Sequence, residues 1–339
     1  MRERETKGFP WGRIAEKVEL SVQPFDADIS RVRLLASILL GTALLNLACA
    51  APHAMRHRGG PAHGRVRVQL NKQIVSVPMD DYVRVVILSE FSPGPAEPGA
   101  VEKMLELQAV VSRTYALFPR HRGQGFDFCA STHCQLYDPS GTKTARWAAA
   151  AARAARNTSG VVLWFDRRPA RIAFHADCGG RTSAARDVWS GLEPSYLTAL
   201  DDGGPAAVAH SKWRFAPPRP ALLAALNADA RTRVGGRLDR IDVLKRDDGG
   251  RVQLVSLKGE RAPLVRGEDL RAVLTRAFGF RALGSTRFEV VPLKGTFEFS
   301  GRGLGHGVGL CQVGAFARIS AGANPADVLA HYFPGTSAH

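Results

Sequence analysis

The chain has 339 residues, 45% of them hydrophobic, so it can bury a substantial core and is not a disordered polymer. Its 46 Lys and Arg residues outnumber 31 Asp and Glu, and a net charge of +15 suits a polyanionic partner: nucleic acid, anionic lipid or an acidic cell-wall polymer. The basic residues are scattered, with no long run interleaved with aromatic residues and no RNA-binding or zinc-finger signature, so nucleic acid is not an expected partner.

The N-terminal region resembles an export signal. Arg31 and Arg33 precede an apolar run over 34–51 that ends in small residues, which is the order of a secretion signal. We therefore assign residues 1–51 to an N-terminal extension and signal segment, and 52–64 to a flexible tether. The protein is expected in the cell envelope, in the periplasm or on the outer face of the membrane.

Cys49 leaves two interpretations open. Ala48-Cys49 suggests a lipoprotein in which Cys49 carries lipid, whereas Ala48-Cys49-Ala50 also fits ordinary signal cleavage. Membrane contact is expected only through an uncleaved signal anchor or a lipidated Cys49. Without residues 1–48 the chain keeps a charge of +14, so the basicity belongs to the exported part.

Beyond the tether, the hydrophobic periodicity predicts mixed helices and strands. The expected strands are 65–70, 73–77, 161–165, 170–175, 240–245, 251–257, 288–293 and 296–299, and the expected helices are 81–90, 100–118, 144–156, 313–320 and 325–332. The stretch of about 203–245 is less informative. The pattern indicates an α+β fold with mixed helices and antiparallel strands.

Glu90 is a candidate acid. Val83, Val86, Ile87 and Glu90 share one face of the first predicted helix, so Glu90 extends an apolar stripe and lies at the negative end of the helix dipole. Desolvation and the dipole both disfavour the carboxylate, so its pKa should rise, as a general acid near neutral pH requires. The alternative is an exposed glutamate at a fraying helix end.

Residues 301–310 carry glycine at every second position. In an extended chain the five glycines would lie on one face and leave bare backbone for a ligand or another strand, with Arg302 and His306 on the opposite face. The spacing excludes a dinucleotide-binding fingerprint.

Cysteine and histidine residues form two local groups. Cys129, His133 and Cys134 can bind Zn²⁺ with a fourth ligand such as His121, Cys178 or Cys311, although a disulfide fits equally well. His175, Asp177 and Cys178 also suggest a thiol nucleophile, but neighbours on one strand alternate faces, which argues against it.

Several blocks in chain order resemble the stage II sporulation protein D (SpoIID/LytB) family of lytic transglycosylases and amidase enhancers. They are Asp81-Tyr82-Val83 through Glu90, 107–116 (LQAVVSRTYA), Cys129 through Tyr137, 178–182 (CGGRT), 267–274 (GEDLRAVL), the glycine-rich 301–310 with 312–315 (QVGA), and 331–336 (HYFPGT). The resemblance implies a SpoIID-like domain over 65–339, with a variable β-rich part at 203–296 and a glycan-binding cleft.

The family's functional residues map onto this chain by those blocks. The resemblance implies that Glu90 is the catalytic acid, with Arg113 and Tyr196 as further catalytic residues, while Thr198 stands where a lysine is expected. The substrate-binding residues that it implies are Gln108, Arg302, Gly305, His306, Gly307 and Gln312.

The implied reaction needs no cofactor, although some members bind zinc at the Cys129/His133/Cys134 group, and His121 is our candidate fourth ligand. A lytic transglycosylase needs one carboxyl group where most glycosidases need two, because the C6 hydroxyl of N-acetylmuramic acid attacks its own anomeric carbon. The expected partners are peptidoglycan glycan strands stripped of stem peptides and a wall amidase. The alternative function is non-catalytic activation of that amidase.

Overall fold

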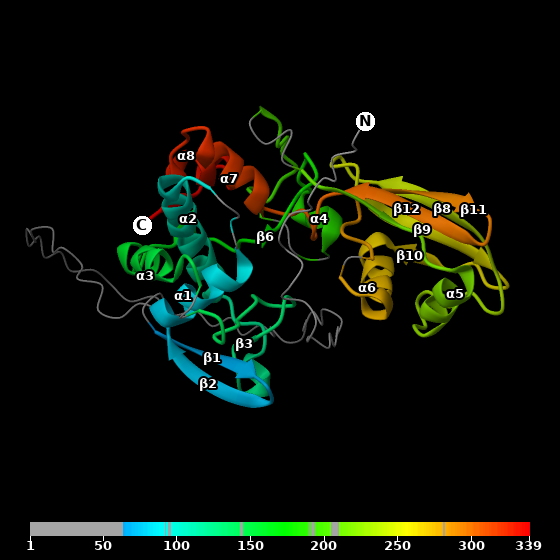
Figure 1. The fold of residues 1–339 in the computed structure, drawn as a ribbon, viewed down its shortest axis with the longest axis horizontal. Coiled ribbons are helices and arrows are strands. Elements are labelled where there is room, and N and C mark those ends of the chain that lie inside the picture. Colours follow the sequence, from blue (N-terminus) through cyan, green and yellow to red (C-terminus); the bar gives the residue numbers. More distant parts are fainter. Residues whose placement is uncertain are drawn as a thin grey trace, which may run out of the picture.

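The computed structural model describes residues 64–91, 93, 96–142, 145–189, 191, 194–204, 210–280 and 282–339 (Figure 1). The predicted signal segment, Cys49 and all but the last residue of the predicted tether lie outside the described residues. Among the residues described, no helix is both long and apolar enough to cross a bilayer.

The α+β prediction is confirmed: the described chain forms helices and several small, mostly antiparallel sheets. Buried side chains fall into two hydrophobic cores, one drawn from 66–197 and 308–333 and the other from 222–299. We call the corresponding parts the first lobe (65–202 and 310–339) and the second lobe (212–302), joined by a return segment (303–309). Figure 1 shows the two lobes side by side, with α4 and β6 between them.

The first lobe is built around a long central helix. Helix α2 contacts α1, α3, α7 and α8. The helices of this lobe are α1 (Met79–Glu90), α2 (Pro98–Ala116), α3 (Ala148–Asn157), α4 (Ala185–Val188), α7 (Gln312–Ser320) and α8 (Pro325–Tyr332), with a 3₁₀ turn at Arg122–Gln124. Its strands are β1 (Arg65–Leu70), β2 (Gln73–Pro78), β3 (Phe128–Cys129), β4 (Leu163–Phe165), β5 (Arg168–Pro169), β6 (Phe174–His175), β13 (Leu310–Cys311) and β14 (Ser337–Ala338).

Local sequence signals explain where the first elements begin and end. Strands β1 and β2 form the predicted hairpin, and Asn71 and Lys72 take φ of 48° and 67°, as the two central residues of a tight hairpin turn require. Helix α2 begins with Pro98 in its first turn, and the Glu97 carboxylate accepts the Ala100 N–H at 2.7 Å. Helix α3 begins at Ala148, four residues later than predicted.

The second lobe pairs two three-stranded sheets with two helices. The sheets have the orders β10-β9-β8 and β11-β12-β7. Its elements are β7 (Lys212–Phe215), α5 (Arg219–Asn227), β8 (Leu238–Arg246), β9 (Val252–Gly259), β10 (Leu264–Arg266), α6 (Gly267–Phe278), β11 (Phe288–Leu293) and β12 (Thr296–Arg302). Strand β7 and helix α5 lie in the stretch that the sequence left uninformative, and α6 is a further helix that the periodicity did not predict.

The return segment corrects the expectation of an extended strand with bare backbone. Gly303, Gly305, Gly307 and Gly309 have φ of 80°, 105°, 82° and 70°, so the chain turns at every second residue instead of running straight. The space beside these glycines is filled by the protein itself. A Cβ at Gly307 would overlap the guanidinium of Arg251, and one at Gly303 would lie 2.7 Å from the Asp177 carbonyl oxygen.

Arg251 of the second lobe is buried in the junction that this segment makes. Its guanidinium donates to the carbonyl oxygens of Cys178 at 2.8 Å and Gly305 at 3.3 Å. Arg287 likewise donates to the Gly179 carbonyl at 2.7 Å. Two arginines of the second lobe therefore bind main-chain oxygens of the first lobe and the return segment.

We expect Gly307→Ala to destabilise the protein much more than Gly279→Ala. Both positions have positive φ, which costs a non-glycine residue about 1–2 kcal/mol, but a Cβ at Gly279 meets nothing within 4 Å. Urea denaturation of both variants measures the difference. Equal losses would show that Arg251 does not fill the site beside Gly307.

Candidate functional site

Glu90 is the last residue of α1, as predicted. Val83, Val86 and Ile87 on the same face are fully buried, and Glu90 itself is half-buried. Its carboxylate accepts the Leu136 N–H at 2.6 Å. The side chain therefore continues the apolar stripe and is fixed at the helix end rather than exposed there.

Burial raises the pKa of Glu90 from 4.5 to about 7, and the hydrogen bond from the Leu136 N–H opposes that rise. The predicted upward shift is confirmed, with desolvation as its cause. A carboxyl group with this pKa is protonated in a large fraction of molecules at neutral pH, and it can both donate and accept a proton there.

The residues around Glu90 link it to the cysteine-histidine group. Burial raises the pKa of Tyr115, the positive charge of Arg120 opposes that rise, and both Cys134 and Glu90 lie close enough to raise it further. Leu136, the donor to Glu90, lies two residues after Cys134. The loop over 129–136 therefore connects the acid with the cluster.

Cys129, His133 and Cys134 lie together with His121, which we call the first cluster. One ligand atom from each of the four side chains lies within 4.8 Å of the others. The two sulfurs are 2.9 Å apart, and their shared hydrogen bond lowers the pKa of Cys129 to about 3. Of the three fourth ligands considered from sequence, His121 is the one that the fold brings to this cluster.

The donor set of the first cluster suits a tetrahedral zinc ion, around which the two sulfurs, 2.9 Å apart here, would lie roughly 3.8 Å apart. Each sulfur lies 3.7 Å from the His133 Nδ1, close to the roughly 3.6 Å that separates sulfur and nitrogen ligands of tetrahedral Zn²⁺. Nε2 of His121 is buried and has no hydrogen-bond partner among the described residues. Two thiols and two imidazoles, one of them with an unpaired buried nitrogen, are the donor set of a Cys₂His₂ site.

Arg113 does not lie near Glu90, contrary to our expectation. Its fully buried guanidinium pairs with Asp80 at 2.7 Å and donates to the carbonyl oxygens of Thr158 at 2.7 Å and Ala155 at 3.0 Å. Asp80 is in the first turn of α1, and ten helical residues, about 15 Å, separate it from Glu90. Arg113 thus joins the start of α1 to the end of α3.

Three more residues implied as functional are buried in the first lobe. The Tyr196 hydroxyl donates to the Arg171 carbonyl oxygen at 3.1 Å, and its ring lies 4.6 Å from that of Phe165. Gln312 donates to the side-chain oxygen of Gln108 at 3.2 Å, and both amides are buried. These contacts connect α2 with α7 and leave neither glutamine open to a glycan in this structure.

His306, Gly305 and Gly307 are likewise occupied by the protein. The Val308 N–H donates to the His306 Nδ1 at 3.1 Å, so Nε2 carries the proton and donates to the Phe174 carbonyl at 2.9 Å. Burial lowers the pKa of His306 to about 3, so the ring is neutral. Gly305 and Gly307 pack against His175 and Arg251. The expected glycan contacts of these three residues have no support in this geometry.

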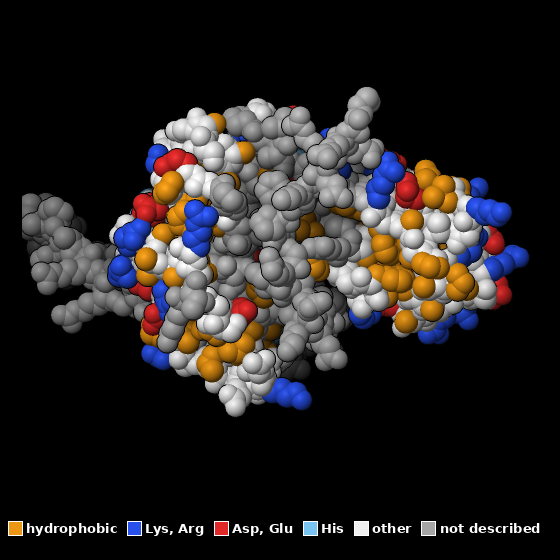
Figure 2. Space-filling model, viewed as in Figure 1, with side chains coloured by type: hydrophobic (Ala, Val, Ile, Leu, Met, Phe, Trp, Pro, Cys, Tyr) orange, Lys and Arg blue, Asp and Glu red, His pale blue; other side chains and the backbone are white. Residues whose placement is uncertain are grey.

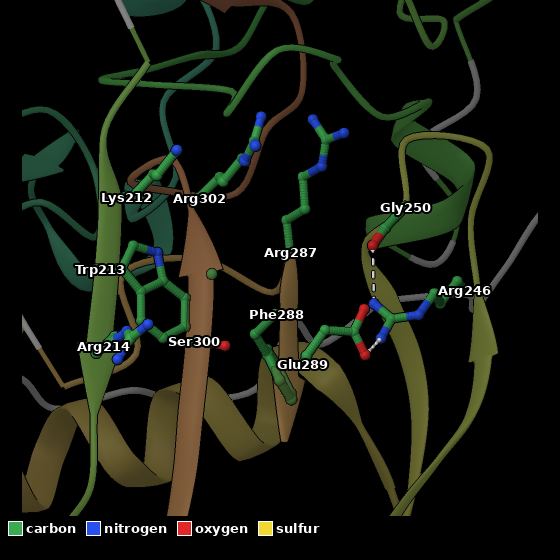
Figure 3. A pocket seen from close by; sticks show the side chains of 11 residues that line it. Lys212, Trp213, Arg214, Arg246, Gly250, Arg287, Phe288, Glu289, Ser300 and Arg302 are labelled. Carbon is green, nitrogen blue, oxygen red and sulfur yellow. Dashed lines mark hydrogen bonds and ion pairs between the residues drawn. The ribbon is translucent and has the colours of Figure 1, made fainter. Parts of the chain in front are cut away.

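Arg302 is exposed, on the rim of a hollow of about 720 Å³ in the second lobe. Five basic residues and one acidic residue line it, together with Trp213, and Figure 3 shows Lys212, Arg302 and Arg287 pointing the same way across β7, β12 and the start of β11. The remaining charged lining residues are Arg214, Arg246 and Glu289, the last two paired at 2.7 Å.

This hollow gathers basic side chains whose position the sequence did not predict. Lys and Arg side chains otherwise scatter over both lobes on the face drawn in Figure 2. Lys212, Arg214 and Arg302 have no side-chain hydrogen bond or ion pair with other described residues, so their charges are available to an anionic ligand. Glu90 does not line the hollow, and a cleft beside Glu90 stays a prediction.

Sequence reasoning missed His210. It lies with Asp177, Cys178 and Cys311 in a second cluster, where one ligand atom from each residue lies within 4.8 Å of the others. His210 comes from the uninformative stretch, which is why no spacing rule found it. Cys178 is fully buried, and His175 bonds the Val308 carbonyl at 3.1 Å, so the two do not form a nucleophile–base pair.

The fold and the two clusters define an α+β protein with a buried acid beside a metal-type cysteine-histidine group. Residues 69–165 match the sequence profile of the stage II sporulation protein family, SpoIID, and residues 212–309 match a domain of unknown function, DUF8618. Residues 69–165 thus carry the match to the SpoIID family, and the chain is a distant homologue of stage II sporulation protein D and of the amidase enhancer.

The similar proteins include stage II sporulation protein D of Bacillus amyloliquefaciens, 25% identical with 78% of this chain and 75% of that protein covered. Stage II sporulation protein D of Bacillus subtilis (strain 168) is 24% identical, with 78% and 76% covered. The amidase enhancer of Bacillus subtilis (strain 168) is also 24% identical, but the match covers 69% of this chain and only 37% of that protein.

The raised pKa of Glu90 predicts a pH-dependent stability. The folded protein binds this proton more tightly than the unfolded chain, so ionised Glu90 destabilises the fold, increasingly from pH about 4.5 to about 7 and constantly above. Glu90→Gln should therefore gain stability over wild type across that window, by on the order of 3 kcal/mol. Chemical denaturation at several pH values measures this, with the exposed Glu260→Gln as control. A stability difference between wild type and Glu90→Gln that does not change with pH would contradict the raised pKa of Glu90.

Arg113→Lys should destabilise the protein by on the order of 3 kcal/mol, because lysine cannot reach Asp80 and both helix-end carbonyls together. A double-mutant cycle with Asp80→Asn should show non-additive losses. Arg84→Lys, which alters a looser 3.9 Å pair on α1, is the control. Additive losses of stability would show that Arg113 and Asp80 do not stabilise the fold through their ion pair.

Proposed function

We propose that this protein is an exported lytic transglycosylase that cleaves peptidoglycan glycan strands freed of their stem peptides, with Glu90 as acid and base. The observation that carries the proposal is the half-buried Glu90 carboxyl group, fixed by Leu136, with a pKa of about 7. The match to the SpoIID family supports a role in cell-wall remodelling.

The reaction requires one group that first gives and then takes a proton. Protonated Glu90 donates to the oxygen of the bond between N-acetylmuramic acid and N-acetylglucosamine, and that bond breaks. The ionised carboxylate then takes the proton of the muramic C6 hydroxyl as its oxygen bonds to the anomeric carbon. The product is a 1,6-anhydro sugar, Glu90 is protonated again, and intramolecular attack supplies a large effective concentration.

The charge of the chain fits the proposed substrate. Removal of stem peptides leaves a lactyl carboxylate on each muramic residue, so the strand becomes a regular polyanion. The hollow lined by Lys212, Arg214 and Arg302 offers free cations beside the ring of Trp213, a combination suited to an acidic sugar. One long glycan strand would be bound by the second lobe at this hollow and cleaved at a separate place, beside Glu90.

Zinc at the first cluster would support the acid without taking part in the reaction. His121, Cys129, His133 and Cys134 would bind the ion, whose contribution there is structural. The bound loop continues to Leu136, whose N–H binds Glu90. The cluster would thereby fix the position of the acid.

A second candidate function is non-catalytic binding of glycan and activation of a wall amidase. It is favoured by Arg113, which pairs with Asp80 at the start of α1 and not with Glu90, and by Tyr196, whose hydroxyl donates to the Arg171 carbonyl oxygen inside the first lobe. Thr198 in place of the expected lysine favours it as well. One of the similar proteins is an amidase enhancer.

Incubation with denuded glycan, followed by mass spectrometry for 1,6-anhydro products, distinguishes the two functions. Wild type should form these products, and Glu90→Gln should be slower by at least about 100-fold, because general acid catalysis is lost. The rate should fall as the pH rises above about 7 and Glu90 ionises.

Glu260→Gln, which removes an exposed carboxylate of the second lobe, should retain full activity. Equal absence of product from wild type and Glu90→Gln, with glycan still bound in a pull-down, would overturn the enzyme proposal in favour of the activator.

A further inference from the structure

The second cluster gathers two thiols, an imidazole and a carboxylate at the junction of the lobes. We propose that Asp177, Cys178, His210 and Cys311 bind a divalent ion of the zinc type at the junction of the lobes. Asp177 and Cys178 follow β6, Cys311 ends β13, and His210 lies two residues before β7. The proposal is independent of the cleavage chemistry at Glu90.

The four donor atoms converge on one small volume, and the His210 Nδ1 and the Asp177 carboxylate, 2.7 Å apart here, would lie roughly 3.3 Å apart around a tetrahedral ion. All four lie within 4.8 Å of one another. The Cys178 sulfur is 3.9 Å from the His210 Nδ1, against about 3.6 Å for sulfur and nitrogen on one tetrahedral zinc. Two thiols, an imidazole and a carboxylate are ligands that Zn²⁺ accepts.

The two ring nitrogens of His210 both face acceptors. Nε2 lies 3.3 Å from the Asp202 carbonyl oxygen, the arrangement that commonly holds a ligating histidine. With that N–H donated, Nδ1 points at the Asp177 carboxylate 2.7 Å away and at the Cys178 sulfur. Two acceptors on Nδ1 need a positive charge between them, either a second ring proton or a metal ion.

Main-chain N–H groups donate to both sulfur atoms of the second cluster. Cys311 is the N-cap of α7, and its sulfur accepts the N–H groups of Gly314 at 3.3 Å and Cys178 at 3.2 Å. The Cys178 sulfur accepts the Gly180 N–H at 3.2 Å. A helix N-terminus and several N–H donors stabilise a negative sulfur and so favour metal binding over neutral thiols.

Asp202 is the remaining acidic group beside the cluster, and its Oδ2 accepts the Cys178 thiol at 3.1 Å when no ion is bound. Asp202 is fully buried, and its Oδ1 accepts the Tyr332 hydroxyl at 2.6 Å and an Arg318 N–H at 3.0 Å. Asp177 is fixed by Ser211, whose N–H and hydroxyl both donate to Oδ2 at 2.7 Å. Asp177 and His210 are thus oriented before an ion arrives, as in a built site.

Zinc analysis of the purified protein tests the proposal. In a background of Cys49→Ala, Cys129→Ser and Cys134→Ser, the only cysteines left are Cys178 and Cys311. This protein should contain one equivalent of zinc. After replacement by cobalt it should show a thiolate-to-metal charge-transfer band and the visible bands of a tetrahedral site.

Adding Cys311→Ser should abolish both signals, and adding His210→Asn should lower metal affinity by at least about 10-fold. Adding His331→Asn, which alters a histidine outside the cluster, should change neither signal. If the background protein fails to fold, the comparison is made in the otherwise unchanged chain, where Cys311→Ser should lower the zinc content by one equivalent and an unchanged zinc content would overturn the proposal.

The background protein would overturn the proposal by containing no zinc and showing no cobalt charge-transfer band. A mass lower by two hydrogens, which marks a Cys178–Cys311 disulfide, would overturn it equally. In that case His210 carries the second ring proton instead of a metal.

Discussion

The contact between the buried Arg251 guanidinium and the glycine-rich return segment determines how the two lobes join. Arg251 belongs to the second lobe, yet it binds carbonyl oxygens of Cys178 and Gly305. Gly307 leaves the room that this side chain fills, and the positive φ values of its neighbours turn the chain around it. The same junction brings His210 to Cys178 and Cys311, so the geometry of the second cluster depends on this packing.

The first lobe organises its acid by a different route. Helix α1 is held at its start by the Arg113–Asp80 pair and ends at Glu90. The loop after β3 carries the first cluster and then the N–H that binds Glu90. Of the residues in the family motifs, Glu90 carries the raised pKa at the end of α1, while Arg113, Gln108, Gln312 and Tyr196 make buried contacts between the helices and loops of this lobe.

Local patterns predicted much of this arrangement. The apolar stripe of α1 identified Glu90 and the direction of its pKa shift, and the spacing of Cys129, His133 and Cys134 predicted a cluster that the fold completes with His121. The return segment was predicted wrongly, because alternation suggests an extended strand and cannot reveal that Arg251 packs between the glycines. His210 could not be predicted as a member of the second cluster. Its partners lie at least thirty residues away in the sequence, and only tertiary packing brings them together.

The hydrogen bond to Glu90 comes from the main chain of Leu136, and this limits how the acid can be retuned. A replacement at position 136 keeps the N–H unless the new residue is proline. Sequence changes can therefore hardly alter how far the Leu136 N–H lowers the pKa of Glu90. They can alter how far burial raises it, through the apolar side chains around the carboxyl group. A sequence adapted to a lower or higher pH would therefore differ in the apolar side chains around the carboxyl group, while the backbone donor would persist.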